Sequence, residues 1–255
     1  MEHTTLRHRQ YYRLFLSCLL ASGLAFSCSK PKGGPAPTEP VTVPVVKDTT
    51  AVISVNRSLK QQIIDGFGFF GAQDVWWAGG NLFSEAWAVQ AIDDLGMTIW
   101  RNEYYPDDAG QDADWAKQKP VVEGLAKAAR ERNVPLKFIF TVWSPPARFK
   151  CALDNDNNPV SGTPHPGGAK KGGTLDPAKY TEFGNWLADG IQLYKNSGVD
   201  VYAISPQNEP LFKQDFNSCY YKPQKWYGEM LKQALPVVRQ RFPAIKFFGS
   251  ENMLG

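Results

Sequence analysis

The chain has 255 residues, of which 43% are hydrophobic, 13% aromatic and 21% charged, and its formal net charge is +3. This composition is typical of a globular domain with a hydrophobic core, and it excludes a wholly disordered or fibrous protein. No run of lysine or arginine stands beside a predicted helix, so the charge pattern argues against a protein that binds nucleic acid.

The first 28 residues are typical of an export signal. Arg7, Arg9 and Arg13 precede an apolar stretch over residues 14–27, which is shorter than the ~20 residues that a membrane-spanning helix needs. Residues 25–28, AFSC, resemble a bacterial lipoprotein cleavage motif in which Cys28 becomes the lipidated N-terminus. An ordinary cleaved signal peptide is the alternative. In either case we expect export, to the periplasm, the outer membrane or the cell surface of a bacterium, with membrane contact only through the lipid.

Residues 29–50 predict a linker, because a segment rich in proline and glycine buries little apolar area and tends to stay extended. A globular domain is expected over residues 51–255. Its only cysteines, Cys151 and Cys219, could pair as a disulfide in an oxidising compartment, and their spacing does not indicate zinc.

The globular part begins with two short β-rich runs, over residues 51–55 and 61–64, which predict a preliminary pair of strands. A regular alternation of strand and helix follows. Strands are predicted over 66–72, 97–100, 134–142, 199–205 and 244–249, and helices over 84–95, 120–132, 176–198 and 223–241.

These strands are continuous apolar runs, as in parallel sheets that are buried on both faces, so the sequence predicts an α/β fold. We expect a (β/α)8 TIM barrel, because the glycines at 66, 68 and 71 lie inside a strand rather than in a phosphate-binding turn. Eight units of about 40 to 45 residues need more than 300 residues. The barrel is therefore expected to be incomplete, an N-terminal fragment with about the first five strands.

Polar residues that follow the strands of such a barrel line a common mouth. Here the mouth combines carboxylate, amide, arginine and aromatic side chains: Gln73, Asp74, Trp76, Trp77, Arg101, Asn102, Glu103, Tyr104, Trp143, Ser144, Gln207, Asn208, Glu209, Glu251 and Asn252. Carboxylates beside tryptophans suit glycoside chemistry, because an acid protonates the leaving oxygen and flat rings stack on sugars. His165 is the only histidine of the globular part, so we expect no Ser-His-Asp triad, metal or cofactor.

The long segment 144–173 predicts a loop that forms one wall of the mouth. Its acidic and amide stretch, residues 154–158, lacks the glycine of a calcium-binding loop, so a polar turn is expected there.

Three motifs in this order resemble glycoside hydrolase family 30. Residues 204–210, ISPQNEP, are similar to the acid/base motif of the large clan of retaining glycosidases that are built on (β/α)8 barrels. Residues 65–68, DGFG, and residues 143–146, WSPP, narrow the resemblance to that family, with its xylanase-like and glucosylceramidase-like members. The resemblance covers residues 63–252.

The resemblance implies that Glu209 is the general acid/base and that Asn208 binds the sugar 2-hydroxyl. It implies that Arg101 holds the nucleophilic carboxylate, with a structural salt bridge to Glu103 as the alternative. Trp143 is expected to stack on the substrate. Further substrate contacts are expected from Asp74, Glu103 and Trp76.

The family's nucleophile is a glutamate after the seventh strand, which this chain lacks, and Glu251 is not expected to replace it. The family also has a companion β-sandwich, to which residues 51–64 could contribute. We therefore expect a monomeric retaining hydrolase of a β-linked carbohydrate, of the xylan, β-glucan or glucosylceramide class. This chain alone should be inactive, because the mechanism needs two carboxyl groups about 5 to 5.5 Å apart. The alternative is a noncatalytic carbohydrate-binding lipoprotein.

Overall fold

The computed structural model describes residues 50–71, 83–104, 114–165, 172–213 and 217–252. The predicted leader, with Cys28, lies outside these ranges, as does all of the predicted linker except residue 50. Chain contacts separate residues 1–60 from residues 61–255, which form the folded unit discussed here. No helix within the described ranges combines the length and the apolar character that crossing a membrane requires.

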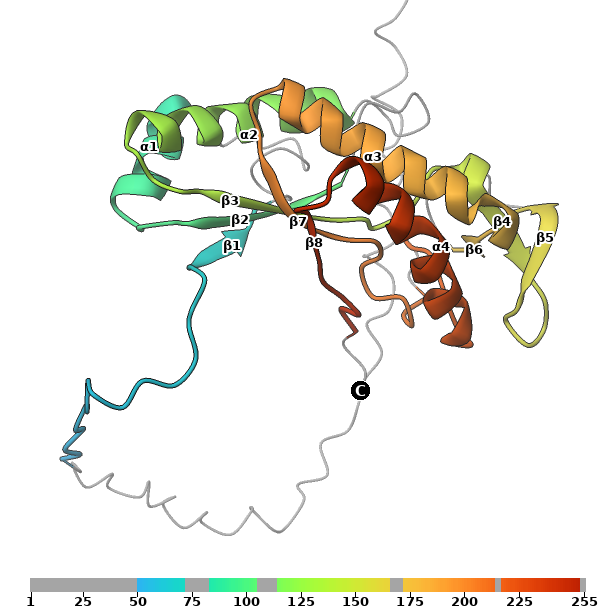
Figure 1. Ribbon diagram of the computed structural model, residues 1–255, viewed down its shortest axis with the longest axis horizontal. Coiled ribbons are helices and arrows are strands. Elements are labelled where there is room, and N and C mark those ends of the chain that lie inside the picture. The colour runs from blue at the N-terminus through green and yellow to red at the C-terminus, as the bar shows by residue number, and fades with distance from the viewer. Residues whose placement is uncertain (1–49, 72–82, 105–113, 166–171, 214–216, 253–255) are drawn as a thin grey trace, which may run out of the picture. The chain divides into compact units, whose positions relative to one another are not determined.

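The folded unit is built on a parallel sheet whose strands are ordered β1-β2-β3-β7-β8. Its strands are β1 (Gly68–Phe70), β2 (Ile99–Glu103), β3 (Lys137–Thr141), β7 (Val201–Ser205) and β8 (Lys246–Phe247). The helices between them are α1 (Glu85–Asp93), α2 (Asp114–Glu131), α3 (Tyr180–Asn196) and α4 (Lys225–Arg241). Figure 1 shows α1, α2 and α3 along the same side of the sheet. The predicted α/β fold with parallel strands is confirmed.

The predicted strand pair before the sheet is wrong. Residues 50–67 contain a turn and extended chain but no strand, and Val52 and Ile53 are 91% and 85% exposed. A run of β-branched residues forms a strand only where a neighbouring strand supplies hydrogen bonds and a surface to pack on. The runs at residues 51–55 and 61–64 have neither in the part of the chain that the structure describes.

Capping explains where α1 begins and ends. The Ser84 hydroxyl accepts a hydrogen bond from the backbone N–H of Trp87 at 3.0 Å, which satisfies one of the free donors of the first turn. The chain then turns at Gly96, whose φ of +60° favours glycine. Leu95, the last residue of the predicted helix range, lies beyond the end of the helix and is 68% exposed.

Helix α2 begins at Asp114, six residues before the predicted start at Pro120. Proline is common in the first turn of helices, which is why the sequence places the start there. In the structure Pro120 lies inside the helix, where it leaves one carbonyl of the preceding turn without its usual donor.

Asp176 caps the third helical segment, which begins where the sequence predicts, although a 3-10 turn, η3 (Pro177–Lys179), precedes α3. Its carboxylate accepts hydrogen bonds from the Ser161 hydroxyl at 2.6 Å and from the N–H groups of Gly162 at 2.8 Å and Ala178 at 2.9 Å. Burial raises the pKa of Asp176, but the three hydrogen bonds outweigh burial and hold it below the usual 3.8.

The segment predicted as a long loop instead forms a short 3-10 turn and a small antiparallel sheet of order β5-β4-β6. Its elements are η2 (Ala147–Phe149), β4 (Lys150–Leu153), β5 (Pro159–Pro164) and β6 (Thr174–Leu175). The polar turn expected at residues 154–158 joins β4 to β5. There the Asp154 carboxylate accepts hydrogen bonds from the N–H groups of Asp156 and Asn158.

The two cysteines of the folded unit are buried, free thiols, so the predicted disulfide is not formed. Strand β6 explains this. Thr174 pairs with Cys151 on one side, while on the other side Tyr220, next to Cys219, donates its N–H to the Gly173 carbonyl. Segments on opposite sides of a strand are about 10 Å apart. A disulfide needs Cα atoms within about 7 Å.

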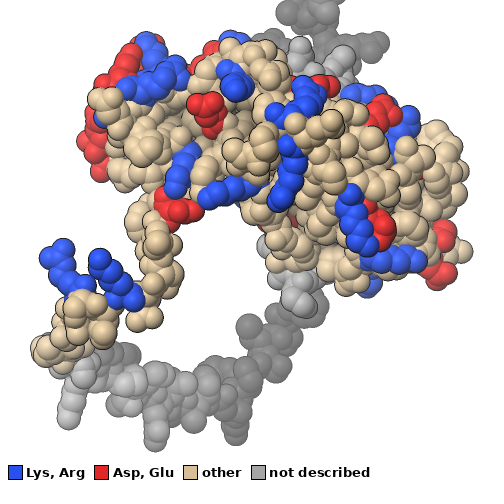
Figure 2. All heavy atoms as spheres, viewed as in Figure 1, with Lys and Arg blue, Asp and Glu red and all other residues tan. Residues whose placement is uncertain are grey.

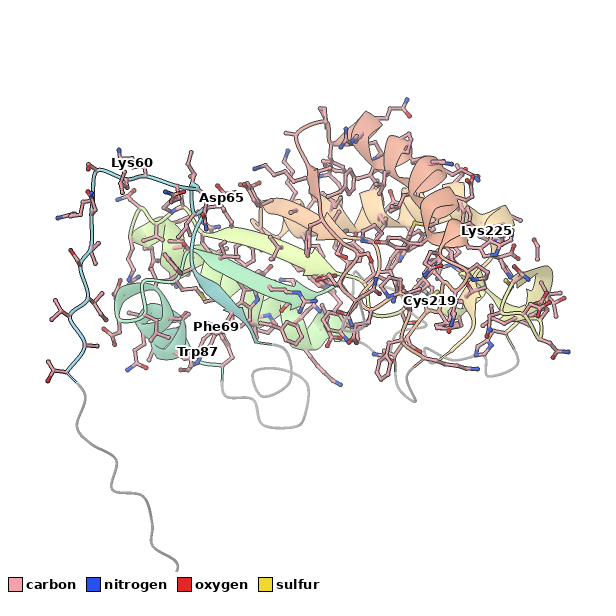
Figure 3. The ribbon with its side chains drawn as sticks, turned by 90° about the horizontal axis from the view of Figure 1, so that it is seen from below. Lys60, Asp65, Phe69, Trp87, Cys219 and Lys225 are labelled. Atoms are coloured by element: carbon pink, nitrogen blue, oxygen red, sulfur yellow. The ribbon has the colours of Figure 1, made fainter. Side chains whose placement is uncertain are left out.

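Aromatic side chains fill the space between the sheet and its helices. Trp100 and Trp186 are 0% and 8% exposed and belong to the core. Trp87 packs against Trp100 with ring centroids 5.7 Å apart and lies beside Phe69 of β1 (Figure 3).

On the outer surface, acidic and basic side chains lie next to one another over the helices (Figure 2).

Candidate functional site

The carboxyl ends of neighbouring strands meet around Arg101, near the end of β2. Its Nη2 donates hydrogen bonds to Asn208 Oδ1 at 3.1 Å and to Glu251 Oε1 at 2.8 Å. Its Nε donates to the Thr141 hydroxyl, at the end of β3, at 3.2 Å. Since Asn208 follows β7 and Glu251 follows β8, one guanidinium connects the ends of four parallel strands.

Two aromatic rings lie against the same guanidinium. Phe70, the last residue of β1, stacks on Trp143 with centroids 5.2 Å apart and planes inclined by 12°. The Arg101 Cζ atom is 5.0 Å from the Phe70 centroid and 4.9 Å from that of Trp143. These three distances form a nearly equilateral triangle, so the cation lies beside the stacked pair and not between the rings. Phe70 is 39% exposed, which leaves aromatic surface open at the site.

Glu209 follows Asn208 in an uncommon backbone conformation, with a φ of +46°. A non-glycine residue in the left-handed region costs about 1 to 3 kcal/mol, and strained residues of this kind cluster at functional sites. The Asn208 amide donates from Nδ2 to Glu209 Oε2 at 3.0 Å. Glu209 is thus connected through Asn208 to Arg101, beside the Phe70–Trp143 ring pair.

Gln207 fixes the loop that carries these residues. It is fully buried, and its side-chain amide donates to the backbone carbonyls of Trp143 at 2.9 Å and Asn208 at 2.8 Å. One buried side chain therefore connects the loop after β3 to the loop after β7.

A second buried connection between the same loops is made by Lys150. Its ammonium donates to the Ser144 hydroxyl at 3.1 Å and to the Ser218 carbonyl at 2.7 Å, and the residue is 3% exposed. Burial lowers the pKa of Lys150 to about 8, and the nearby Cys219 raises it only in part.

The structure brings together four of the predicted site residues: Arg101, Asn208, Trp143 and Glu209. Glu103 lies deeper, at 4% exposure, and the carboxylate paired with Arg101 at 2.8 Å is that of Glu251. Asp74 and Trp76 lie outside the described residues. Among the described residues, no group of three or more His, Cys, Asp or Glu side chains is placed to hold a metal ion.

Sequence reasoning missed Phe70, Thr141 and Lys150 as parts of this site. Phe70 and Thr141 are the last residues of strands, but both fall within the predicted strand ranges and so do not stand out as mouth residues. Lys150 lies within the segment predicted as a loop. Its apolar surroundings depend on β6 and on residues 217–221, which are distant in sequence.

Comparisons with known proteins show what this chain is similar to in sequence and fold. No family model matches the chain. The glucuronoxylanase of Bacillus subtilis is 28% identical over 175 residues, 68% of this chain and 36% of that protein. An endo-1,6-β-D-glucanase of Aspergillus fumigatus is 36% identical over 77 residues, 30% of this chain and 16% of that protein.

Solved structures extend the likeness to the fold. The family 30 subfamily 8 xylanase of Clostridium acetobutylicum matches with a TM-score of 0.58 and 25% identity, over 78% of this chain and 45% of that one. The chain resembles glycoside hydrolase family 30 in both sequence and fold. An endo-β1,6-glucanase, 18% identical, has the same fold with a TM-score of 0.62 over 78% of this chain and 46% of that one. The chain thus spans less than half the length of each of these four proteins.

Proposed function

We propose that this chain is part of a retaining glycoside hydrolase that acts on a β-linked glycan or glycoside. It would supply the acid/base half of a (β/α)8 barrel. The observation that carries the proposal is the connected set Arg101–Asn208–Glu209 beside the Phe70–Trp143 ring pair, at the carboxyl edge of a parallel sheet. That edge is where active sites of such barrels lie. The similarity to a family 30 xylanase, a glucuronoxylanase and an endo-1,6-β-D-glucanase supports the class of substrate.

In the proposed mechanism Glu209 donates a proton to the leaving-group oxygen and later removes a proton from water. Asn208 donates to Glu209 Oε2, so the proton that Glu209 transfers is carried by Oε1. The ring pair offers a flat apolar surface on which a sugar face can stack. The cation at Arg101 lies where it can stabilise a carboxylate that approaches the sugar.

The nucleophile of a retaining mechanism is proposed to lie outside the described residues. Glu251 is not assigned this role, because it follows β8, the fifth strand of the parallel sheet in chain order, and its Oε2 is buried. Export and lipidation at Cys28 are also part of the proposal, and they are supported by the arginine-flanked apolar leader and the AFSC motif.

The experiment is hydrolysis of a panel of β-glycans, with xylan, glucuronoxylan, β-1,6-glucan and glucosylceramide, by the full-length protein. The proposal expects turnover of at least one member, with retention of anomeric configuration in the first product. A noncatalytic carbohydrate-binding lipoprotein is the second candidate, favoured by the partly exposed Phe70–Trp143 pair. Binding of a panel member that Trp143→Ala abolishes, without any turnover, would support this candidate and contradict the hydrolase.

A further inference from the structure

Among the residues that the structure describes, Glu251 is the carboxylate paired with Arg101, and neither the sequence motifs nor the relatives assign it a role. Its position is fixed by a parallel bridge between its backbone and that of Asn208. Its Oε1 accepts from Arg101 at 2.8 Å and from the Thr141 hydroxyl at 3.4 Å. Its Oε2 is buried and has no hydrogen-bond partner among the described residues. The polar contacts of this carboxylate are therefore directed at Arg101 and its neighbour.

The ion pair is largely removed from water, since the side chains of Arg101 and Glu251 are 24% and 20% exposed. A charge-assisted hydrogen bond in such surroundings is short, strong and geometrically specific. Thr141 holds the Nε side of the guanidinium, while Glu251 and Asn208 share Nη2. Glu251 is thus the anionic contact that fixes which way Nη2 points.

The direction of Nη2 decides the orientation of the Asn208 amide. A guanidinium only donates hydrogen bonds, so Asn208 must present its oxygen to Arg101. Its nitrogen then faces the other way and donates to Glu209 Oε2 at 3.0 Å. With the amide reversed, two donors would face each other at Arg101 and two acceptors would face each other at Glu209. The placement of Arg101 therefore determines how Glu209 is held.

We propose that Glu251 is a positioning residue for the acid/base. By holding Arg101, it keeps the Asn208 amide oriented so that Glu209 Oε2 accepts a hydrogen bond and Oε1 carries the transferable proton. This inference rests on the proposed hydrolase function, and it adds a residue after the β8 strand to the machinery of that site.

The kinetic test compares Glu251→Ala with Glu251→Gln in the full-length protein. Glutamine keeps an acceptor for Arg101 but removes the charge, so it should retain more activity than alanine. For a glycoside with a poor leaving group we expect Glu251→Ala to lower kcat by about 10- to 100-fold, as for a misplaced catalytic group. For an activated aryl glycoside, which needs little protonation, the loss should be much smaller. The control is Glu229→Gln, which removes an exposed ion-pairing carboxylate of α4.

A double variant separates positioning from general damage. If Glu251 acts through Glu209, the variant that carries both Glu251→Ala and Glu209→Ala should be no slower than Glu209→Ala alone. Equal loss on both kinds of substrate, or losses that multiply in the double variant, would overturn the proposal.

A measurement on Arg101 needs no turnover, so it distinguishes failure of this inference from failure of the proposed function. Nitrogen-15 spectra follow the exchange of the Arg101 Nε–H with water, with Arg101→Lys used for assignment. In Glu251→Ala the exchange should be faster by about tenfold or more, since Arg101 loses its anionic contact. Unchanged exchange in Glu251→Ala would contradict the proposal even in an active enzyme. Faster exchange in a protein that hydrolyses no glycan would contradict only the hydrolase assignment.

Discussion

Replacement of Lys150 by methionine should change how the stability of this fold depends on pH. Lys150 is 3% exposed, and burial lowers its pKa from 10.5 to about 8. In the folded state its charged form is therefore disfavoured by about 2.5 pKa units, or about 3 kcal/mol. Methionine has a similar length and carries no charge, so Lys150→Met removes this cost together with the hydrogen bonds to Ser144 and Ser218.

The sign of the effect follows from proton binding. Between about pH 8 and pH 10.5 the unfolded chain keeps a proton on Lys150 that the folded chain has released. Stability therefore rises with pH in this window, and the cost is fully present below it. The free energy of unfolding of the wild type, minus that of Lys150→Met, should rise by about 3 kcal/mol from pH 7 to pH 10.5.

The assay is urea unfolding at half-unit pH steps, with both proteins in a Cys219→Ser background, because the Cys219 charge acts on Lys150. Other titrations are common to both proteins and cancel in the difference. Lys232→Met, which removes an exposed ammonium, is the matched control. A difference between wild type and Lys150→Met that stays constant from pH 7 to pH 10.5 would show that Lys150 is not held in a buried, poorly solvated position.

Three other outcomes follow from the contacts described above. Phe70→Ala should weaken binding of the substrate oligosaccharide by about 5- to 10-fold in calorimetry, because Trp143 loses a stacking partner worth about 1 kcal/mol; unchanged affinity would argue against a role for the pair. Thiol titration of the oxidised, denatured mature protein should find two free thiols, those of Cys151 and Cys219. A titration that finds no free thiol would indicate a disulfide between them. Asp176→Ala should lower the free energy of unfolding by about 1 to 3 kcal/mol near neutral pH. Because the folded pKa of Asp176 is lowered, this loss should shrink as pH falls below 3.8, and a pH-independent loss would contradict the hydrogen-bond account.

Local chemistry made the main elements predictable. Ser84 and Asp176 are capping residues with free acceptors, and both cap helical segments in the structure. Apolar runs without alternation identify the strands of a parallel sheet, although the observed strands are shorter than predicted. Pro120 misplaced one boundary, because a proline favours the first turn of a helix but is here accommodated, at a cost, in the interior.

The rest depends on which distant segments meet, and local sequence carries little information about that. Strand β4 exists because β5 and β6 pair with it, and the intervening β6 also keeps Cys151 and Cys219 apart. In the site, the motif residues Asn208 and Glu209 could be identified from their neighbours in sequence. The contact of Arg101 with Glu251 could not, because it depends on the register of strands that are 150 residues apart.

The most direct test of the account is the activity of Glu209→Ala in the full-length protein, measured with and without added azide. If Glu209 is the acid/base, the variant should lose most activity on a glycoside with a poor leaving group and much less on an activated aryl glycoside. Azide should then restore turnover of the activated substrate and yield a glycosyl azide. Equal loss on both substrates, with no glycosyl azide formed, would contradict the assignment of this site.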